Sequence, residues 1–250
     1  MSKLVSIITP AYNAETFIEE LYFCLLKQTY SNWEWLVTDD CSTDKTYDIL
    51  LRLSLQDPRV KPQKNSVNSG AAVTRNNSLA RASGDFIAFI DSDDIWHSKK
   101  LELQLKFMGD DIKFSFTAYK IISEDGIDSG QTVDTHHISP VTYVDMLKKK
   151  ATLGCSTVIL RRNVIDDLTM PLLRTGQDYA LWLKILKTGV KAHALTEVLT
   201  EYRIVAGSIS RNKFKKARRQ WQIYREVECL SILNAAYCFC FYAWRAVFRK

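Results

Sequence analysis

The chain has 250 residues, of which 46% are hydrophobic and 25% are charged, and this composition excludes a wholly disordered protein. A chain of this length can bury one large core or two modest ones. The net charge of +6 is unevenly spread, because residues 211–219 hold six basic side chains, and such a stretch can meet phosphates of nucleic acid, anionic lipid or a small substrate.

The first 95 residues alternate strand-like and helix-like segments. Apolar runs predict strands at 4–9, 33–38, 59–63 and 86–90. Helical spacing of apolar residues predicts helices at 14–28, 42–53 and 70–84. Ser42 or Thr43 is the expected N-cap of the second helix, and Pro62 favours an edge position for the third strand. This alternation predicts an α/β protein with a parallel sheet, whose ligands bind outside the carboxyl ends of the strands.

From residue 97 onward the pattern is mixed. Helices are expected at 99–108, 143–150 and 178–189, and strands at 112–122 and 156–162. Residues 125–130 have the composition of a turn, Thr142 and Asp145 form a candidate capping box, and Gly189 is a candidate C-cap. Because no internal repeat or low-complexity linker separates the two halves, we expect them to share one sheet.

Five carboxylates follow two of the predicted strands. Asp39 and Asp40 come after the second strand, and Asp91, Asp93 and Asp94 come after the fourth. A single aspartate at such a position usually caps a helix or shapes a turn. Three within four residues repel one another unless a cation neutralises them, and carboxylate oxygen suits Mg²⁺ and Mn²⁺. The cluster therefore favours a metal–diphosphate site over a structural turn.

Four segments together resemble one enzyme family. They are "VSIITPAYNAE", "WEWLVTDDCSTD", "NSGAAVTRNNSLARASGDFIAFIDSDD" and "GQDYALWL". Their order and spacing, over about residues 3–210, are similar to those of inverting glycosyltransferases of family 2 with the GT-A fold. The segment "YRIVAGSISRNKFKKARRQW" is similar to the subgroup that builds bacterial O-antigen and exopolysaccharide repeat units.

The resemblance implies a fold and a division of labour. A Rossmann-like half (1–96) would bind UDP-sugar and metal, and a second half (97–205) in the same mixed sheet would bind the acceptor and supply the base. A hexose, glucose or galactose, would move from the UDP-sugar to a saccharide on a polyprenyl diphosphate, with β linkage. Residues 206–250 would form a basic, aromatic tail, helical and amphipathic or hydrophobic, that associates with the membrane.

The resemblance also implies roles for individual residues. Tyr12 would stack near the uracil, Asp40 would accept its N3–H, and Asp178 would be the catalytic base. The implied nucleotide-sugar contacts are Pro10, Ala11, Tyr12, Asp39, Asp40, Arg75, Asp91 and Ser92, and the implied ligands of Mn²⁺ or Mg²⁺ are Asp91, Asp93 and Asp94. The chain departs from the family pattern at Gln177, where Glu is more common, and at Cys41, where Gly permits a positive φ.

Several of these residues also have plainer interpretations. Without the resemblance, Asp178 at the start of a predicted helix is best explained as an N-cap. Trp182 is expected to fill the core. His97 directly follows the acidic cluster and is a weaker candidate for a phosphate or metal contact. His136, His137 and His193 lack metal-ligand spacing to any cysteine and are expected to be structural.

Residues 229–248 are nearly all apolar or aromatic, and their length would just cross a bilayer. Asn234 and Arg245 interrupt the run, and its aromatic content together with the preceding cations predicts a helix lying in the inner leaflet. The alternative is a helix packed on the core or on a second copy in a homodimer. The first residues lack a secretory leader pattern, so we expect reduced thiols and a cytoplasmic, peripheral enzyme with no nucleic-acid partner.

Two other functions fit part of the sequence. A haloacid dehalogenase-like phosphatase also places Asp-x-Asp after an apolar strand, but it needs that motif on its first strand and a Thr or Val where this chain has Ile95. A non-catalytic, membrane-bound sugar-nucleotide binding protein would keep the nucleotide site without turnover. The presence of both the acidic cluster and Asp178 argues against it.

Overall fold

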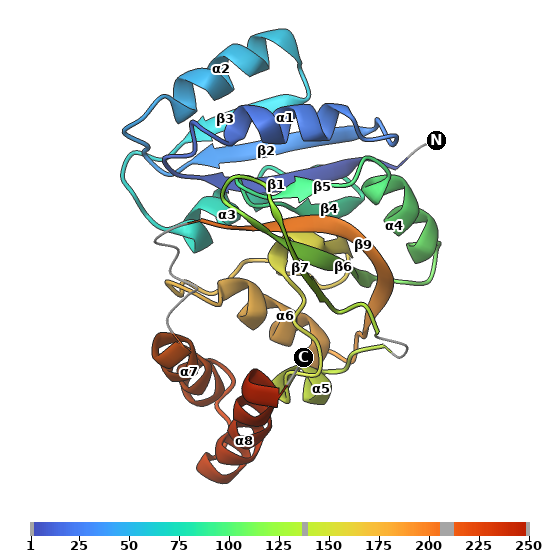
Figure 1. Cartoon of the computed structure of the whole chain (residues 1–250), viewed down its shortest axis with the longest axis vertical. Helices are drawn as coiled ribbons and strands as arrows, with labels where there is room; N and C mark the ends of the chain where they lie inside the picture. The colour runs from blue at the N-terminus through green and yellow to red at the C-terminus, as the bar shows by residue number, and fades with distance from the viewer. Residues whose placement is uncertain (1–2, 137–139, 206–212, 249–250) are drawn as a thin grey trace.

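The computed structural model describes residues 3–136, 140–205 and 213–248 (Figure 1). The first half contains β1 (Val5–Ala11), α1 (Ile18–Leu26), β2 (Trp33–Asp39), α2 (Thr46–Gln56), β3 (Val60–Lys64), α3 (Ala71–Leu79), β4 (Phe86–Phe89) and β5 (Ile95–Trp96). The second half contains α4 (Lys100–Met108), β6 (Phe114–Ser123), β7 (Asp128–Val133), α5 (Tyr143–Leu147), a 3-10 turn (Cys155–Thr157), β8 (Val158–Arg161), α6 (Gln177–Lys187) and β9 (Ala192–Ile204). The C-terminal segment contains α7 (Lys213–Gln222), a π-helix (Ile223–Val227) and α8 (Ile232–Phe248). His137 and the first residues of the predicted tail, 206–212, lie outside the described residues.

One mixed sheet joins the two halves, as predicted. Its strand order is β3-β2-β1-β4-β8-β6-β9-β5, with β7 paired to β6. The strands β1, β2, β3 and β4 run parallel, whereas β8 is antiparallel to both β4 and β6. Strand β3 lies at an edge, which is where Pro62, with no N–H to donate, can be accommodated. The carboxyl ends of β1, β2 and β4 therefore meet at one edge of the sheet.

The two faces of the sheet bury separate apolar clusters. Successive side chains of a strand point to opposite faces, so Ile7 packs with α1, α2 and α4, whereas Ile8 packs with α5, α6 and the C-terminal segment. Figure 1 shows α1 and α2 on one side of the sheet and α5, α6, α7 and α8 on the other. Trp182 is fully buried in the second cluster, and its indole N–H donates to the carbonyl oxygen of Leu153, which confirms its predicted place in the core.

Helix termini follow the sequence in some places and not in others. Thr142 and Asp145 form the predicted capping box of α5. The predicted N-cap of α2 is wrong: the helix begins at Thr46, whose backbone N–H donates to the Asp44 carboxylate at 3.0 Å. The hydroxyl of Ser42 instead accepts a hydrogen bond from the backbone N–H of Asn13. A local cap signal is thus overridden by a contact between two loops.

Two strands of the second half were not predicted. Strand β7 begins within the segment expected to be a turn, and β9 has 13 residues that show no clear apolar alternation. β9 has partly exposed side chains along much of its length and pairs with β6 through register shifts. Such a strand lacks the period-two pattern on which the prediction depends.

Helix α8 packs one of its faces on the core. This arrangement is the one predicted as the alternative to a helix lying in the membrane. Ala235, Cys238 and Tyr242 are buried, while Leu233 is 82% exposed and Trp244 is 63% exposed. Lysine side chains of the α5 region lie over aromatic rings of α8, with the Lys148 ammonium 4.7 Å from the Tyr237 ring centroid. Within the described ranges, no helix has the length and apolarity needed to cross a bilayer.

The loop after β2 keeps a left-handed backbone at Cys41, with φ of +62°. This conformation costs a non-glycine residue about 1–2 kcal/mol, and Gly would remove that cost while adding roughly 0.5–1 kcal/mol of backbone entropy loss. We therefore expect Cys41→Gly to raise the free energy of unfolding by about 0.5–1 kcal/mol in urea titrations. Cys41→Ala is the control, because it removes the thiol and keeps the strain. A Cys41→Gly protein no more stable than Cys41→Ala would contradict the argument.

Candidate active site

Asp39, the last residue of β2, and Asp40, which follows it, are buried and already hold the surrounding loops. Asp39 is fully buried, one of its oxygens accepts the backbone N–H of Ser42, and the other has no hydrogen-bond partner. Asp40 is 4% exposed and accepts hydrogen bonds from the Asn65 side chain and from the backbone N–H groups of Ser69 and Gly70. Burial raises the pKa of Asp40, but these hydrogen bonds outweigh it and the pKa is lowered. Asp40 is thus ionised and fixes the start of α3.

The acidic turn after β4, residues 91–94, is held by Ser156 together with Arg203. The hydroxyl of Ser156, which is 3% exposed, accepts the backbone N–H of Asp91 and donates to Asp94. The other oxygen of Asp94 accepts the backbone N–H of Arg203 at 3.0 Å, so both of its oxygens are bound by protein groups. Burial and the charge of Asp91 raise the pKa of Asp93 to about 6. A carboxyl with a raised pKa loses its proton less readily, and a bound cation would favour its ionised form.

Arg75 lies buried at the centre of the site. The side chain projects from α3, is 4% exposed and forms an ion pair with Asp91. Its Nε and Nη1 groups are buried without a hydrogen-bond partner. Burial lowers the pKa of Arg75, but Asp91, Cys155 and Asp178 outweigh it and the pKa is raised. A buried, charged guanidinium with two unused donors is costly, and this is a strong indication that an anionic ligand binds there.

Asp178 lies near Arg75, in the first turn of α6. The N-cap is Gly176, with φ of +72°, so the interpretation of Asp178 as an N-cap is wrong. Burial raises the pKa of Asp178, Arg75 lowers it and Asp91 raises it, with a net upward shift. A raised pKa makes the carboxylate a stronger base, and the positive end of the helix dipole favours its ionised form. The fold thus brings Asp178 to the acidic turn from the far half of the chain.

Two residues that organise the acidic turn were not predicted. Arg203 of β9 is 5% exposed, and its guanidinium donates to the backbone oxygens of Asp93 and Glu124 and to the carboxylate of Glu20. Ser156 is the other. Arg203 lies in the segment that resembles the O-antigen subgroup, but nothing in that segment indicated a contact with the acidic turn, and Ser156 lies in no motif. Both residues act on groups far away in the sequence.

The remaining predicted residues lie at the same edge of the sheet. Pro10 and Ala11 end β1, and Tyr12 follows them with 51% of its side chain exposed, as a ring available for stacking would be. Ser92 lies in the acidic turn and is partly buried. Gln177 is 8% exposed, and its side-chain oxygen has no hydrogen-bond partner.

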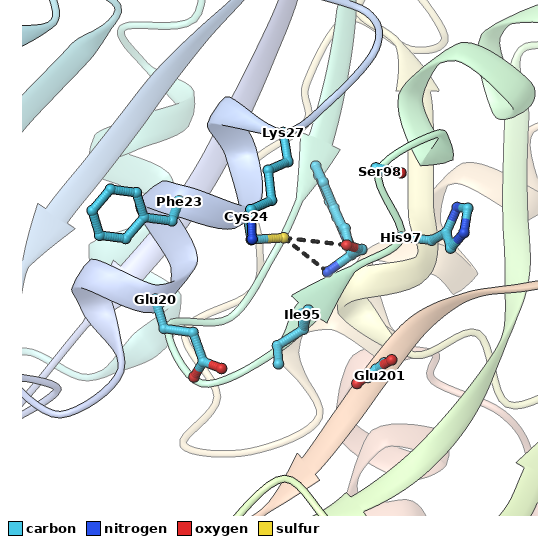
Figure 2. Close-up of a pocket in the computed structure, with 9 residues that line it drawn as sticks. Glu20, Phe23, Cys24, Lys27, Ile95, His97, Ser98 and Glu201 are labelled. Atoms are coloured by element: carbon cyan, nitrogen blue, oxygen red, sulfur yellow. Dashed lines mark hydrogen bonds between the residues drawn. The ribbon is translucent and has the colours of Figure 1, made fainter.

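His97 lines a separate pocket of about 680 Å³ between α1, β5 and β9 (Figure 2). Figure 2 shows the two hydrogen bonds that join the Cys24 thiol to the backbone of Trp96 in its wall. His97 is exposed, and its Nδ1 accepts the backbone N–H of Lys99. The contact of His97 with phosphate or metal stays a prediction, and the position of His97 in this pocket does not support it.

The sheet order, the carboxylates at the ends of β2 and β4, and the buried Arg75 paired with Asp91 define an α/β protein with a charged site at the carboxyl ends of its parallel strands. The family model of glycosyl transferase family 2 matches residues 6–169. The chain belongs to this family.

Relatives and a solved structure agree with that assignment. TuaG of Bacillus subtilis (strain 168), named as a teichuronic acid biosynthesis glycosyltransferase, is 44% identical over 248 residues, which cover 99% of this chain and 97% of TuaG. WfgD of Escherichia coli, named as a UDP-Glc:alpha-D-GlcNAc-diphosphoundecaprenol beta-1,3-glucosyltransferase, is 44% identical over 222 residues, which cover 88% of this chain and 85% of WfgD. TarS 1-349 of S. aureus, solved with UDP-GlcNAc, superimposes with a TM-score of 0.74 at 22% identity, covering 99% of this chain and 73% of TarS 1-349, and so shows the GT-A fold. The phosphatase interpretation is excluded by the family.

Proposed function

We propose that the chain transfers a hexose, with glucose the first candidate, from a UDP-sugar to a saccharide on a polyprenyl diphosphate, with inversion and a β linkage. The observation that carries the proposal is Arg75, whose buried guanidinium has two unused donors beside Asp91 and Asp178. A diphosphate would satisfy those donors. The name of WfgD supports glucose as the donor sugar and an isoprenyl diphosphate as the carrier.

A divalent ion fits the acidic turn only together with a phosphate ligand. The described residues contain no group of three or more His, Cys, Asp or Glu side chains placed to hold an ion. Mg²⁺ and Mn²⁺ commonly take one or two carboxylates and complete their shell with water and substrate phosphates. Asp91 and Asp93 would supply these carboxylates, and Asp94, whose oxygens are both bound by protein groups, would hold the turn. When bound, the ion would neutralise charge on the leaving diphosphate.

The residues of the site would bind the nucleotide, bind the diphosphate and take the proton of the acceptor. Tyr12 and Asp40 would hold the uracil, and Asp39 would support the loop that contains Asp40. Arg75 would bind the diphosphate and, through its ion pair, fix Asp91. Asp178 would take the proton of the acceptor hydroxyl as the oxygen attacks C1 of the sugar from the face opposite the leaving group. A single displacement of this kind inverts the configuration at C1.

A donor screen tests this function. Purified protein is offered UDP-glucose, UDP-galactose, UDP-GlcNAc and GDP-mannose with Mn²⁺ and a synthetic GlcNAc-diphosphate lipid. We expect transfer from a UDP-hexose, and in particular from UDP-glucose. Strong binding of UDP-sugar without transfer to the GlcNAc-diphosphate lipid would favour the non-catalytic binding protein instead.

We further propose that the enzyme acts at the inner face of the cell membrane and binds it through the C-terminal segment. Lys215, Lys216 and Arg218 of α7 are exposed. The outer face of α8 exposes Ile232, Leu233, Tyr237 and Trp244. Cationic and apolar side chains together suit an interfacial helix on anionic lipid, where the lipid-linked acceptor is held. The alternative occupant of this face is a second copy of the chain.

Vesicle co-sedimentation distinguishes these two occupants. The double variant Leu233→Ser, Trp244→Ser should lose at least about tenfold in partition to phosphatidylglycerol vesicles, because each side chain contributes about 1.5–3 kcal/mol when buried. High salt should release the wild-type protein only partly, since it screens charge and leaves apolar burial intact. Leu55→Ser on α2 is the matched control, as Leu55 is 89% exposed outside the tail. The membrane proposal would be contradicted if the wild-type protein stayed in the supernatant when vesicles are pelleted. A dimer in analytical ultracentrifugation without vesicles would then identify a second copy as the occupant of this face.

A further inference from the structure

The C-terminal segment contacts the turn that leads into α6. The Nε of Arg219 donates to the hydroxyl of Thr175 at 3.1 Å, and its Nη1 donates to Gln222 at 2.7 Å, which fixes the guanidinium. The side chain of Ile223 lies against Gly176, where an added Cβ would come within 3.1 Å of its Cδ1. Gly176 is the N-cap of α6 and has φ of +72°, a conformation that favours glycine, and the Ile223 side chain leaves little room for a Cβ there.

The same segment also holds the other end of α6. Glu228 is 7% exposed, and its carboxylate accepts hydrogen bonds from Lys187, the last residue of α6, at 3.2 Å and from Tyr143 at 2.6 Å. Between the two ends, Ile223 and Tyr224 are 1% and 0% exposed. The C-terminal segment therefore packs against α6 through buried side chains and not only through surface contacts.

These contacts bear on Asp178 because it lies two residues after Gly176. We propose that Arg219 and Ile223 are positioning residues for the catalytic base: they hold Thr175 and Gly176 so that the Asp178 carboxylate stays beside Arg75 and Asp91. The inference rests on the proposed function, in which Asp178 is the base. A general base must stay within a fraction of an ångström of its productive position, so a loosened turn lowers turnover without removing any substrate contact.

The C-terminal segment thus serves both the proposed membrane contact and the active site. The segment whose outer side chains would meet the membrane has inner side chains that fix the base. Arg219, which the sequence placed among the membrane-binding cations, is bonded to the protein instead. Deletion of the C-terminal segment would accordingly disturb the active site as well as the membrane contact, and it is not a clean test of either.

The test compares Arg219→Ala, Thr175→Val and the double variant, with a water-soluble acceptor so that membrane binding is not measured. We expect each single variant to lower kcat by about 10- to 100-fold with the KM for UDP-sugar nearly unchanged. The double variant should lose no more than the worse single variant, since both changes remove one hydrogen bond. Arg219→Lys should recover part of the loss. Arg174→Ala is the matched control, because Arg174 is exposed, adjacent to Thr175 and bonded to nothing in the described part of the chain.

Combining Arg219→Ala with Asp178→Asn completes the test. If Arg219 acts through the base, Arg219→Ala should lower kcat no further in the Asp178→Asn enzyme. Full kcat in both Arg219→Ala and Thr175→Val, with Asp178→Asn inactive, would overturn the positioning role and leave the proposed function standing. Additive losses in the Arg219→Ala, Thr175→Val double variant would also overturn it. A fully active Asp178→Asn enzyme would overturn the proposed function and this inference together.

Discussion

Asp178→Asn should lower kcat by about 10²–10⁴-fold, the range typical for loss of a general base. Asn keeps the shape of the side chain and cannot take the proton of the acceptor hydroxyl. The KM for UDP-sugar should change little, because the proposed nucleotide-sugar contacts lie at β1, β2, α3 and the acidic turn after β4, and not on α6. Fold stability should also change little: removing the carboxylate forfeits a favourable helix-dipole interaction of about 0.3–1 kcal/mol and also relieves the burial of a charge.

The control for this prediction is Asp166→Asn. Asp166 is exposed and precedes α6, so the substitution removes one negative charge from the same half of the chain. Its kcat should match that of the wild-type enzyme. An Asp178→Asn enzyme that folds, shows a normal unfolding midpoint and turns over at the wild-type rate would exclude Asp178 as the base.

Asp93→Ala should cut kcat by roughly 10²–10³-fold, because it removes charge stabilisation of the leaving diphosphate. Excess chelator should abolish transfer, and Mn²⁺ should restore it to the wild-type enzyme and not to the variant. Burial and Asp91 raise the pKa of Asp93 to about 6, so the free carboxyl is protonated below that pH. A bound cation requires the ionised form, and the Mn²⁺ concentration for half-maximal rate should therefore rise as the pH falls through 6.

Asp111→Ala provides the comparison for Asp93→Ala. Asp111 is an exposed aspartate outside the site, and its loss should leave both the rate and the Mn²⁺ dependence unchanged. Transfer at the full wild-type rate in excess chelator would show that the acidic turn works without a divalent ion.

Much of the first half was predictable because its signals are local. Central parallel strands are largely apolar on both faces, so β1, β2 and β4 appear as apolar runs with few polar interruptions, and Pro62 marks the edge strand. The carboxylates at the ends of β2 and β4 follow from this topology. The sequence also placed Trp182 in the core correctly.

The parts that the sequence could not predict depend on tertiary contacts. Strand β9 is polar along much of one face because it is only partly covered, so its period is obscured. Arg203 and Ser156 act on backbone groups of the acidic turn, and no local pattern marks such a role. The apolar run of α8 suggested a helix on the membrane, yet Ala235, Cys238 and Tyr242 face the core. The composition of α8 shows that the helix has a large apolar surface. It does not show whether lipid, the core or a second copy of the chain covers that surface.

We expect an inverting transfer at the site formed by Arg75, Asp91 and Asp178. The most direct measurement is the anomeric configuration of the product, determined by NMR after transfer from α-linked UDP-glucose to a synthetic GlcNAc-diphosphate lipid. A single displacement with Asp178 as base predicts a β-linked glucose, with the large coupling between H1 and H2 that this configuration gives. An α-linked product would require a retaining mechanism and would contradict the account.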